Sequence, residues 1–284
     1  MVNDEADFQT SEIFARDCHK ELLTVLKFAI TKVNPLWEII ILKSDRDVSI
    51  NGLYLRAIAW MHGLRKLNEG VDVQPVISGA RSFLEITTDL ILVYYDKTNE
   101  SGWRMRCWDA SAKLKSAKAL IEFFNNRIKQ PIPKEYIDYV NFVNNNEADI
   151  KRQRIILGWV KLNDPTQDIH PKRWSNRSEL LQDVIEADKF HGLIVERHFG
   201  STLETFYETE YRNMNWNVHG SGLTGVRNVD RSGINFIRAF GYNWSAKLAM
   251  VCSDIMLREL KDKGVTGDID NIVSEAEYIS VNLS

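Results

Sequence analysis

The chain has 284 residues, of which 44% are hydrophobic and 26% charged, and its net charge is −3. These values are typical of a soluble globular protein, and they exclude a general electrostatic attraction to nucleic acid. The length suits one large domain or two smaller ones.

Cysteines are few and scattered, so we expect neither a disulfide framework nor a zinc motif. The first ten residues are acidic, and the apolar runs are much shorter than the ~20 residues that a membrane span needs. We therefore expect a cytoplasmic protein that has no export signal and does not enter a membrane. The cysteines are Cys18, Cys107 and Cys252.

Apolar residues recur at steps of three and four along most of the chain, which is the period of an α-helix. The first predicted helix should stop at Asn34–Pro35, and the second at Gly70. The third is apolar around most of its circumference, so we expect it to be buried. The predicted helices are 11–33, 49–69, 75–96, 103–126, 133–159, 178–188, 192–199, 202–218 and 242–263, followed by a short polar tail.

Segment 163–171, "NDPTQDIHP", has the composition of a turn, and we expect a loop there. The fold class should be all-α, a multi-helix bundle with no sheet larger than a hairpin. Two organisations remain open. One is a single helical domain over 1–284; the other has two helical layers hinged near residue 165, divided into 1–162 and 172–284.

The stretch "NVHGSGLTGVRN", residues 217–228, contains the glycine spacing of a dinucleotide-binding loop. Such a loop follows a strand, whereas helix 202–218 precedes this one and opens with a capping box from Ser201 to Glu204. Gly220 is better explained as the residue that ends that helix. We therefore expect no nucleotide cofactor.

Three polar residues of helix 202–218 share one side with the residue that follows the helix. At about 100° per residue, Glu208, Arg212, Asn215 and His219 fall within an arc of about 60°. A guanidinium and an imidazole placed in this way can hold one phosphate and move a proton. The alternative is a solvated face in which Glu208 and Arg212 form an i,i+4 ion pair.

A second polar stripe lies on the predicted buried helix, where Arg81, Glu85 and Asp89 recur every four residues. Buried charges need partners. The stripe is therefore either an internal network or part of a polar pocket shared with Arg212 and His219.

Other residues give weaker indications. "HGLIVERH", residues 191–198, lacks the histidine spacing of a zinc protease, so no metal site is expected, and His19, His62 and His170 have no evident partners. Trp174 could stack on a base or serve as a packing anchor. The candidate substrate-binding residues are Arg81, Glu85, Asp89, Trp174, Arg177 and Tyr211.

Three motifs resemble those of an uncharacterised bacterial family of domains of unknown function: "ARSFLE" (80–85), "RWSNRS" (173–178) and "YRNMNWNVHGS" (211–221). The resemblance spans roughly residues 50–221. Asn176 stands where that family has glycine, and Asn215 where it has serine, which puts a role for that hydroxyl in doubt.

Arg212–Asn213 followed by His219 also resembles, more distantly, the signature of HEPN-type helical ribonucleases. The resemblance implies metal-independent RNA cleavage in a site shared by two protomers. His219 would then act as general acid or base, Arg212 would stabilise the phosphorane charge, and Asn215 or Asn213 would orient the phosphate.

Two functional hypotheses follow. The first is an endoribonuclease of toxin or defence type, a homodimer that acts on RNA with no metal or cofactor and has an antitoxin or other protein partner. The second is a non-catalytic helical binding or interaction module with a structural polar core. The pairing of Arg212 with His219 favours the first, and the acidic composition favours the second.

Overall fold

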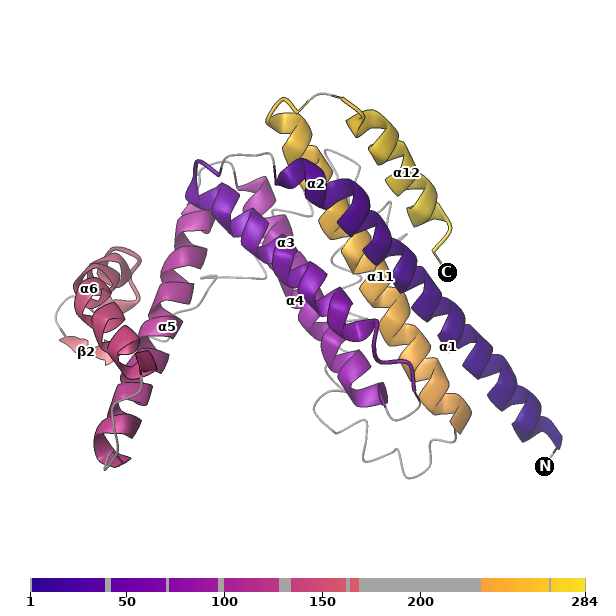
Figure 1. Cartoon of the computed structure of the whole chain (residues 1–284), viewed down its shortest axis with the longest axis horizontal. Coiled ribbons are helices and arrows are strands. Elements are labelled where there is room, and N and C mark those ends of the chain that lie inside the picture. Colours follow the sequence, from indigo (N-terminus) through magenta and orange to yellow (C-terminus); the bar gives the residue numbers. More distant parts are fainter. Residues whose placement is uncertain are drawn as a thin grey trace. The chain divides into compact units, whose positions relative to one another are not determined.

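The computed structural model describes residues 2–38, 42–69, 72–96, 100–127, 134–161, 164–168, 231–265 and 267–283. Within these ranges the chain is helical apart from one two-stranded hairpin, which confirms the predicted all-α fold class (Figure 1). None of the helices there is long and apolar enough to cross a membrane. The main helices are α1 (Val2–Phe28), α3 (Asp45–Leu64), α4 (Val73–Tyr95), α5 (Glu100–Arg127), α6 (Lys134–Ile156), α11 (Arg231–Asp262) and α12 (Ile269–Val281).

The chain divides into two compact units, and the division does not follow chain order. Unit 1 comprises the described residues within 1–43, 50–97 and 178–284. Unit 2 comprises those within 44–49 and 98–177. The first turn of α3 therefore belongs to unit 2 and the rest of that helix to unit 1.

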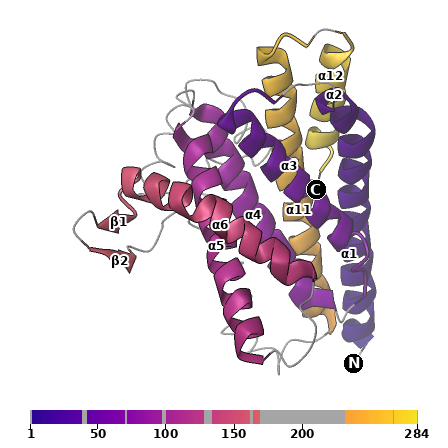
Figure 2. The ribbon, with the colours of Figure 1, turned by 60° about the vertical axis from the view of Figure 1, so that its left-hand side comes forward.

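Three helices that run in the same direction, α1, α11 and α4, form the core of unit 1 (Figures 1 and 2). The direction of α1 and α11 follows from their contacts, because Asn235 bonds Ser11 while Tyr242 packs on His19 about two turns later on both helices. On the other side of α11, the thiol of Cys252 lies 3.3 Å from the hydroxyl of Thr87 on α4. The predicted burial of α4 is confirmed, with 15 of its 23 residues buried.

Helix α11 is longer than the sequence predicts, because the predicted helix covers only 242–263. Instead α11 begins at Arg231 and passes close to α4 at Gly241, where an added Cβ would lie 2.6 Å from Cγ1 of Val76. The glycine serves close packing between two helices and does not end one.

The predicted stop at Asn34–Pro35 is wrong. After α1 the chain continues as a π-helical turn, η1 (Ala29–Val33), and then as α2 (Asn34–Trp37). Pro35 lies in the first turn of α2, where a missing N–H costs nothing. The indole of Trp37 donates to Oδ1 of Asn51 at 2.5 Å, which ties α2 to α3.

Helix α3 begins and ends earlier than predicted. A capping box fixes its start, since Oγ of Ser44 accepts the N–H of Asp47 at 3.1 Å while Oδ2 of Asp47 accepts the N–H of Ser44 at 3.2 Å. The helix ends at Leu64, and in the chain that follows, carbonyls bond to side chains of α11 instead of continuing the helix. Gly70 lies outside the described residues.

Besides the first turn of α3, unit 2 contains α5 packed on α6, followed by a hairpin. Phe124 and Tyr136 stack edge to face at 5.9 Å where the two helices connect, and Lys118 pairs with Glu147 further along. The expected loop at 163–171 is wrong over its described residues, because 164–168 form a strand. β1 (Val160–Lys161) pairs antiparallel with β2 (Asp164–Asp168), because a left-handed turn at Gly158 (φ +68°) ends α6 and redirects the chain.

The expected polar tail is a helix, α12. It buries one face, formed by Ile269, Ile272 and Ala276, and Glu275 pairs with Lys32 at 3.5 Å. The helix turns back along the end of α11 (Figure 1). All three cysteines are buried and free, as the sequence indicated.

Candidate functional site

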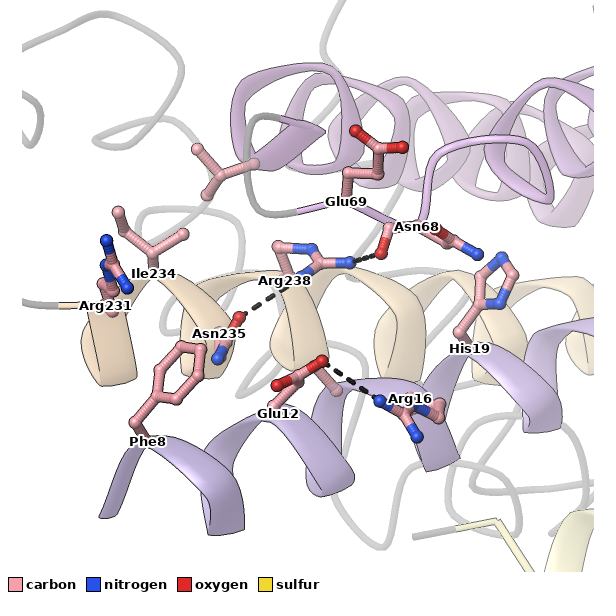
Figure 3. A pocket seen from close by; sticks show the side chains of 12 residues that line it. Phe8, Glu12, Arg16, His19, Asn68, Glu69, Arg231, Ile234, Asn235 and Arg238 are labelled. Carbon is pink, nitrogen blue, oxygen red and sulfur yellow. Dashed lines mark hydrogen bonds and ion pairs between the residues drawn. The ribbon is translucent and has the colours of Figure 1, made fainter. Parts of the chain in front are cut away.

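A pocket of about 840 Å³ opens in unit 1 between the first half of α1, the chain that joins α3 to α4, and the first two turns of α11. It brings together segments separated by more than 150 residues in sequence. Figure 3 shows arginine, asparagine and histidine side chains converging on it from three sides. Its lining residues are Phe8, Glu12, Ala15, Arg16, His19, Asn68, Glu69, Val73, Arg231, Ile234, Asn235 and Arg238.

Arg238 is the central polar residue of this pocket, and it is only 6% exposed. One terminal nitrogen donates to Oδ1 of Asn235 at 3.2 Å, and the other donates to the carbonyl of Asn68. The third donor, Nε, is buried and has no partner among the described residues. Because a guanidinium stays charged, the folded chain holds a buried cation whose hydrogen-bond acceptors among the described residues are neutral.

The geometry around Arg238 follows from helical spacing. Asn235 precedes it by three residues and Tyr242 follows by four, so all three side chains share one face of α11. The guanidinium lies 5.9 Å from the centroid of the Tyr242 ring, and the Tyr242 hydroxyl donates to the carbonyl of Leu67. The α3–α4 connection is thereby held against α11 by two carbonyl bonds.

His19 lies on α1 across from this face. Its Nε2 lies 3.0 Å from the carbonyl of Arg65, so that nitrogen carries the proton, and its ring packs edge-on to Tyr242 at 4.9 Å. Burial lowers the pKa of His19, the bond to Arg65 opposes this, and the positive charge of Arg238 lowers the pKa further. At neutral pH the imidazole is neutral.

Charges at the edge of the pocket are unevenly matched. Glu12 pairs with Arg16 at 3.0 Å on the surface of α1. Glu69 contributes the second carboxylate, and its backbone N–H bonds Oδ2 of Asp72 at 2.8 Å, which shapes the turn before α4. Arg231, exposed on the first described turn of α11, forms no ion pair with another described residue. Three arginines thus face two glutamates around a neutral histidine.

The sequence-predicted stripe on α4 is not part of this pocket. Arg81 and Glu85 form an i,i+4 ion pair at 3.5 Å and keep 23% and 41% of their side chains exposed, while Asp89 is buried at 1%. The polar residues of the pocket come from α1, α11 and the chain before α4. The remaining predicted site residues lie outside the described residues: Arg212, His219, Asn215, Asn213, Trp174, Arg177 and Tyr211.

Sequence reasoning missed the pocket for identifiable reasons. His19 was read as a histidine without partners, yet it bonds Arg65, which is 46 residues away. Arg238 and Asn235 lie outside the predicted helix 242–263, so they are not placed on a common face with Tyr242. Extending that helix through Gly241 places Asn235, Arg238 and Tyr242 on one face, which is the pattern that could have indicated the site.

The described residues contain no group of three or more His, Cys, Asp or Glu side chains placed to hold a metal ion. No protein-family model, no curated protein and no solved structure matches this chain.

Proposed function

We propose that this chain is a helical binding module and that the pocket of unit 1 takes a small organic molecule. The observation that carries the proposal is the pocket itself, which at about 840 Å³ falls within the ~300–1,000 Å³ typical of small-molecule sites. Most of the surface that lines the pocket is apolar although most of its lining residues are polar or charged, and a largely apolar surface with convergent polar groups is usual for such sites.

The second support is that the pocket is formed in advance. Arg238 and Tyr242 hold the α3–α4 connection through the carbonyls of Asn68 and Leu67, and His19 holds it through Arg65. These bonds fix the walls before any ligand arrives, so that little ordering entropy is lost on binding.

The test is a screen of small molecules by thermal shift, followed by calorimetry of the compounds that bind. Val73 lines the pocket, and Val73→Trp should fill it. Ile13→Trp is the matched control, because Ile13 is 57% exposed on α1 and does not line the pocket. We expect binding to be lost in the first variant and kept in the second. Compounds that bind both variants equally would contradict the proposal.

The endoribonuclease hypothesis concerns Arg212 and His219, and so it stays a separate prediction. A binding pocket in unit 1 neither requires nor excludes it.

A further inference from the structure

We infer that the ligand of this pocket is a small organic acid, with one carboxylate or phosphate head against Arg238 and Arg231 and an apolar body along α1 and α4. This inference rests on the proposed function and adds the chemical class of the ligand.

The first argument is the unused capacity of Arg238. Burying a guanidinium is unfavourable unless its charge is compensated. Here its terminal nitrogens bond two neutral oxygens, and Nε bonds none of the described residues. An acid oxygen in the pocket would supply both the missing acceptor and the missing negative charge, in a charge-assisted bond about twice as strong as a neutral one.

The second argument is the position of the charges. Arg231 begins α11, and its side chain points to the same pocket two turns before Arg238 (Figure 3). Glu12 is already paired with Arg16, so it competes less for the other two arginines.

The third argument limits the ligand to one acidic head. Glu12 and Glu69 also line the pocket, and their carboxylates would repel a second or third negative group. A polyanion such as RNA is therefore disfavoured at this site. A single carboxylate or phosphate monoester carries less charge for these carboxylates to repel.

The fourth argument concerns the rest of the volume. A bare phosphate would leave most of about 840 Å³ unfilled. The remaining walls are apolar, and burying apolar ligand surface against them contributes about 25 cal/mol per Å². The apolar lining residues are Phe8, Ala15, Val73 and Ile234.

The experiment measures dissociation constants by calorimetry on the full chain with four probes: phenylacetate, phenyl phosphate, neutral 2-phenylethanol and inorganic phosphate. We expect at least one of the two acids to bind about tenfold or more tightly than the alcohol, and tighter than inorganic phosphate. Comparing the two acids shows which head the pocket prefers.

Two variants assign the preference to the arginines. Arg231→Gln removes an exposed charge, so the fold should survive, and Arg238→Gln removes the buried one. Each should reduce the acid-to-alcohol ratio at least threefold. Arg258→Gln is the matched control, because Arg258 is on the same helix, pairs with Asp254 at 3.1 Å and does not line the pocket.

The outcomes separate this inference from the proposed function. If the alcohol binds as tightly as the acids and Val73→Trp abolishes both, the pocket binds ligands but the acid inference is wrong. A preference that persists in both Arg231→Gln and Arg238→Gln also overturns it, as does inorganic phosphate binding as tightly as phenyl phosphate. If neither the probes nor the screened compounds bind, the proposed function itself fails.

Discussion

The guanidinium of Arg238 lies over the ring of Tyr242 at 5.9 Å, and the two side chains bond consecutive carbonyls, those of Asn68 and Leu67. One face of α11 thus holds a segment that belongs to no helix. The buried polar atoms of this contact connect the pocket to the stability of unit 1, and that connection can be tested.

We expect Tyr242→Phe to lower the free energy of unfolding by about 1–3 kcal/mol, because the carbonyl of Leu67 loses its donor in a partly buried place. Urea unfolding measures the change. Tyr278→Phe is the control, since Tyr278 is 72% exposed, and it should stay within about 0.5 kcal/mol of the parent. Equal effects of the two substitutions would show that the bond to Leu67 contributes nothing to stability.

Two glycines should respond to alanine in opposite directions. In Gly241→Ala the new Cβ would lie 2.6 Å from Val76 Cγ1 and 3.2 Å from Ile77 Cδ1, and overpacking of this kind costs about 1–3 kcal/mol. That exceeds the gain in helix propensity of about 1 kcal/mol. Gly52→Ala, with open space around the new Cβ on α3, should stabilise by about 0.5–1 kcal/mol.

The clash at Gly241 can be assigned by a double-mutant cycle. Val76→Ala removes the nearest obstructing methyl groups, so it should cost less in the Gly241→Ala background than in the parent. Additive effects would mean that the two helices separate to accept the extra methyl group and that no specific clash exists.

The lowered pKa of His19 predicts a pH dependence. Between the folded pKa and the usual value of 6.5, the unfolded chain binds more protons than the folded chain. The free energy of unfolding therefore rises with pH across that window, by at most about 1.4 kcal/mol per pH unit for one proton. The stability that neutral His19 contributes is complete above pH 6.5. It is lost as the pH falls through the folded pKa.

We expect His19→Gln to flatten this dependence, since glutamine does not titrate and can still donate to Arg65. Urea unfolding of both proteins at several pH values between about 5 and 7.5 measures the difference in slope. A parent protein that loses stability with rising pH relative to His19→Gln would show that burial does not dominate at this residue.

The sequence predicts those features of the fold that are determined by residues within one helix, and it does not predict those that depend on contacts between helices. The burial of α4 follows from its own apolar residues, so the pattern of 75–96 was sufficient. The continuation of α11 through Gly241 depends on its close approach to Val76 of α4, which a single helix pattern cannot contain. The same holds for the continuation through η1, where tertiary packing keeps a Pro35-containing segment helical.

The candidate site was harder still to predict, because its residues come from three segments that are individually ordinary. His19 is one polar residue on an apolar face, Asn68 acts through its backbone carbonyl, and Arg238 becomes unusual only once it is buried. The burial of a side chain and the position of a backbone acceptor are properties of the fold. Side-chain chemistry alone, on which the prediction of Arg212 and His219 was based, indicates neither the burial nor the acceptor.

The ribonuclease hypothesis makes a prediction of its own. If Arg212 and His219 form that site, the purified chain should cleave single-stranded RNA in the presence of a chelator, since neither residue needs a metal to act.

His219→Ala should then slow cleavage by about 10²–10⁴-fold, and Arg212→Ala by a comparable factor through lost stabilisation of the transition-state charge. Circular dichroism should show both variants folded. Arg258→Gln is the control, because Arg258 pairs with Asp254 on α11 and does not line the pocket, and its cleavage rate should equal that of the parent. Absence of cleavage by the folded parent under these conditions would reject the ribonuclease hypothesis and leave the binding module as the function to pursue.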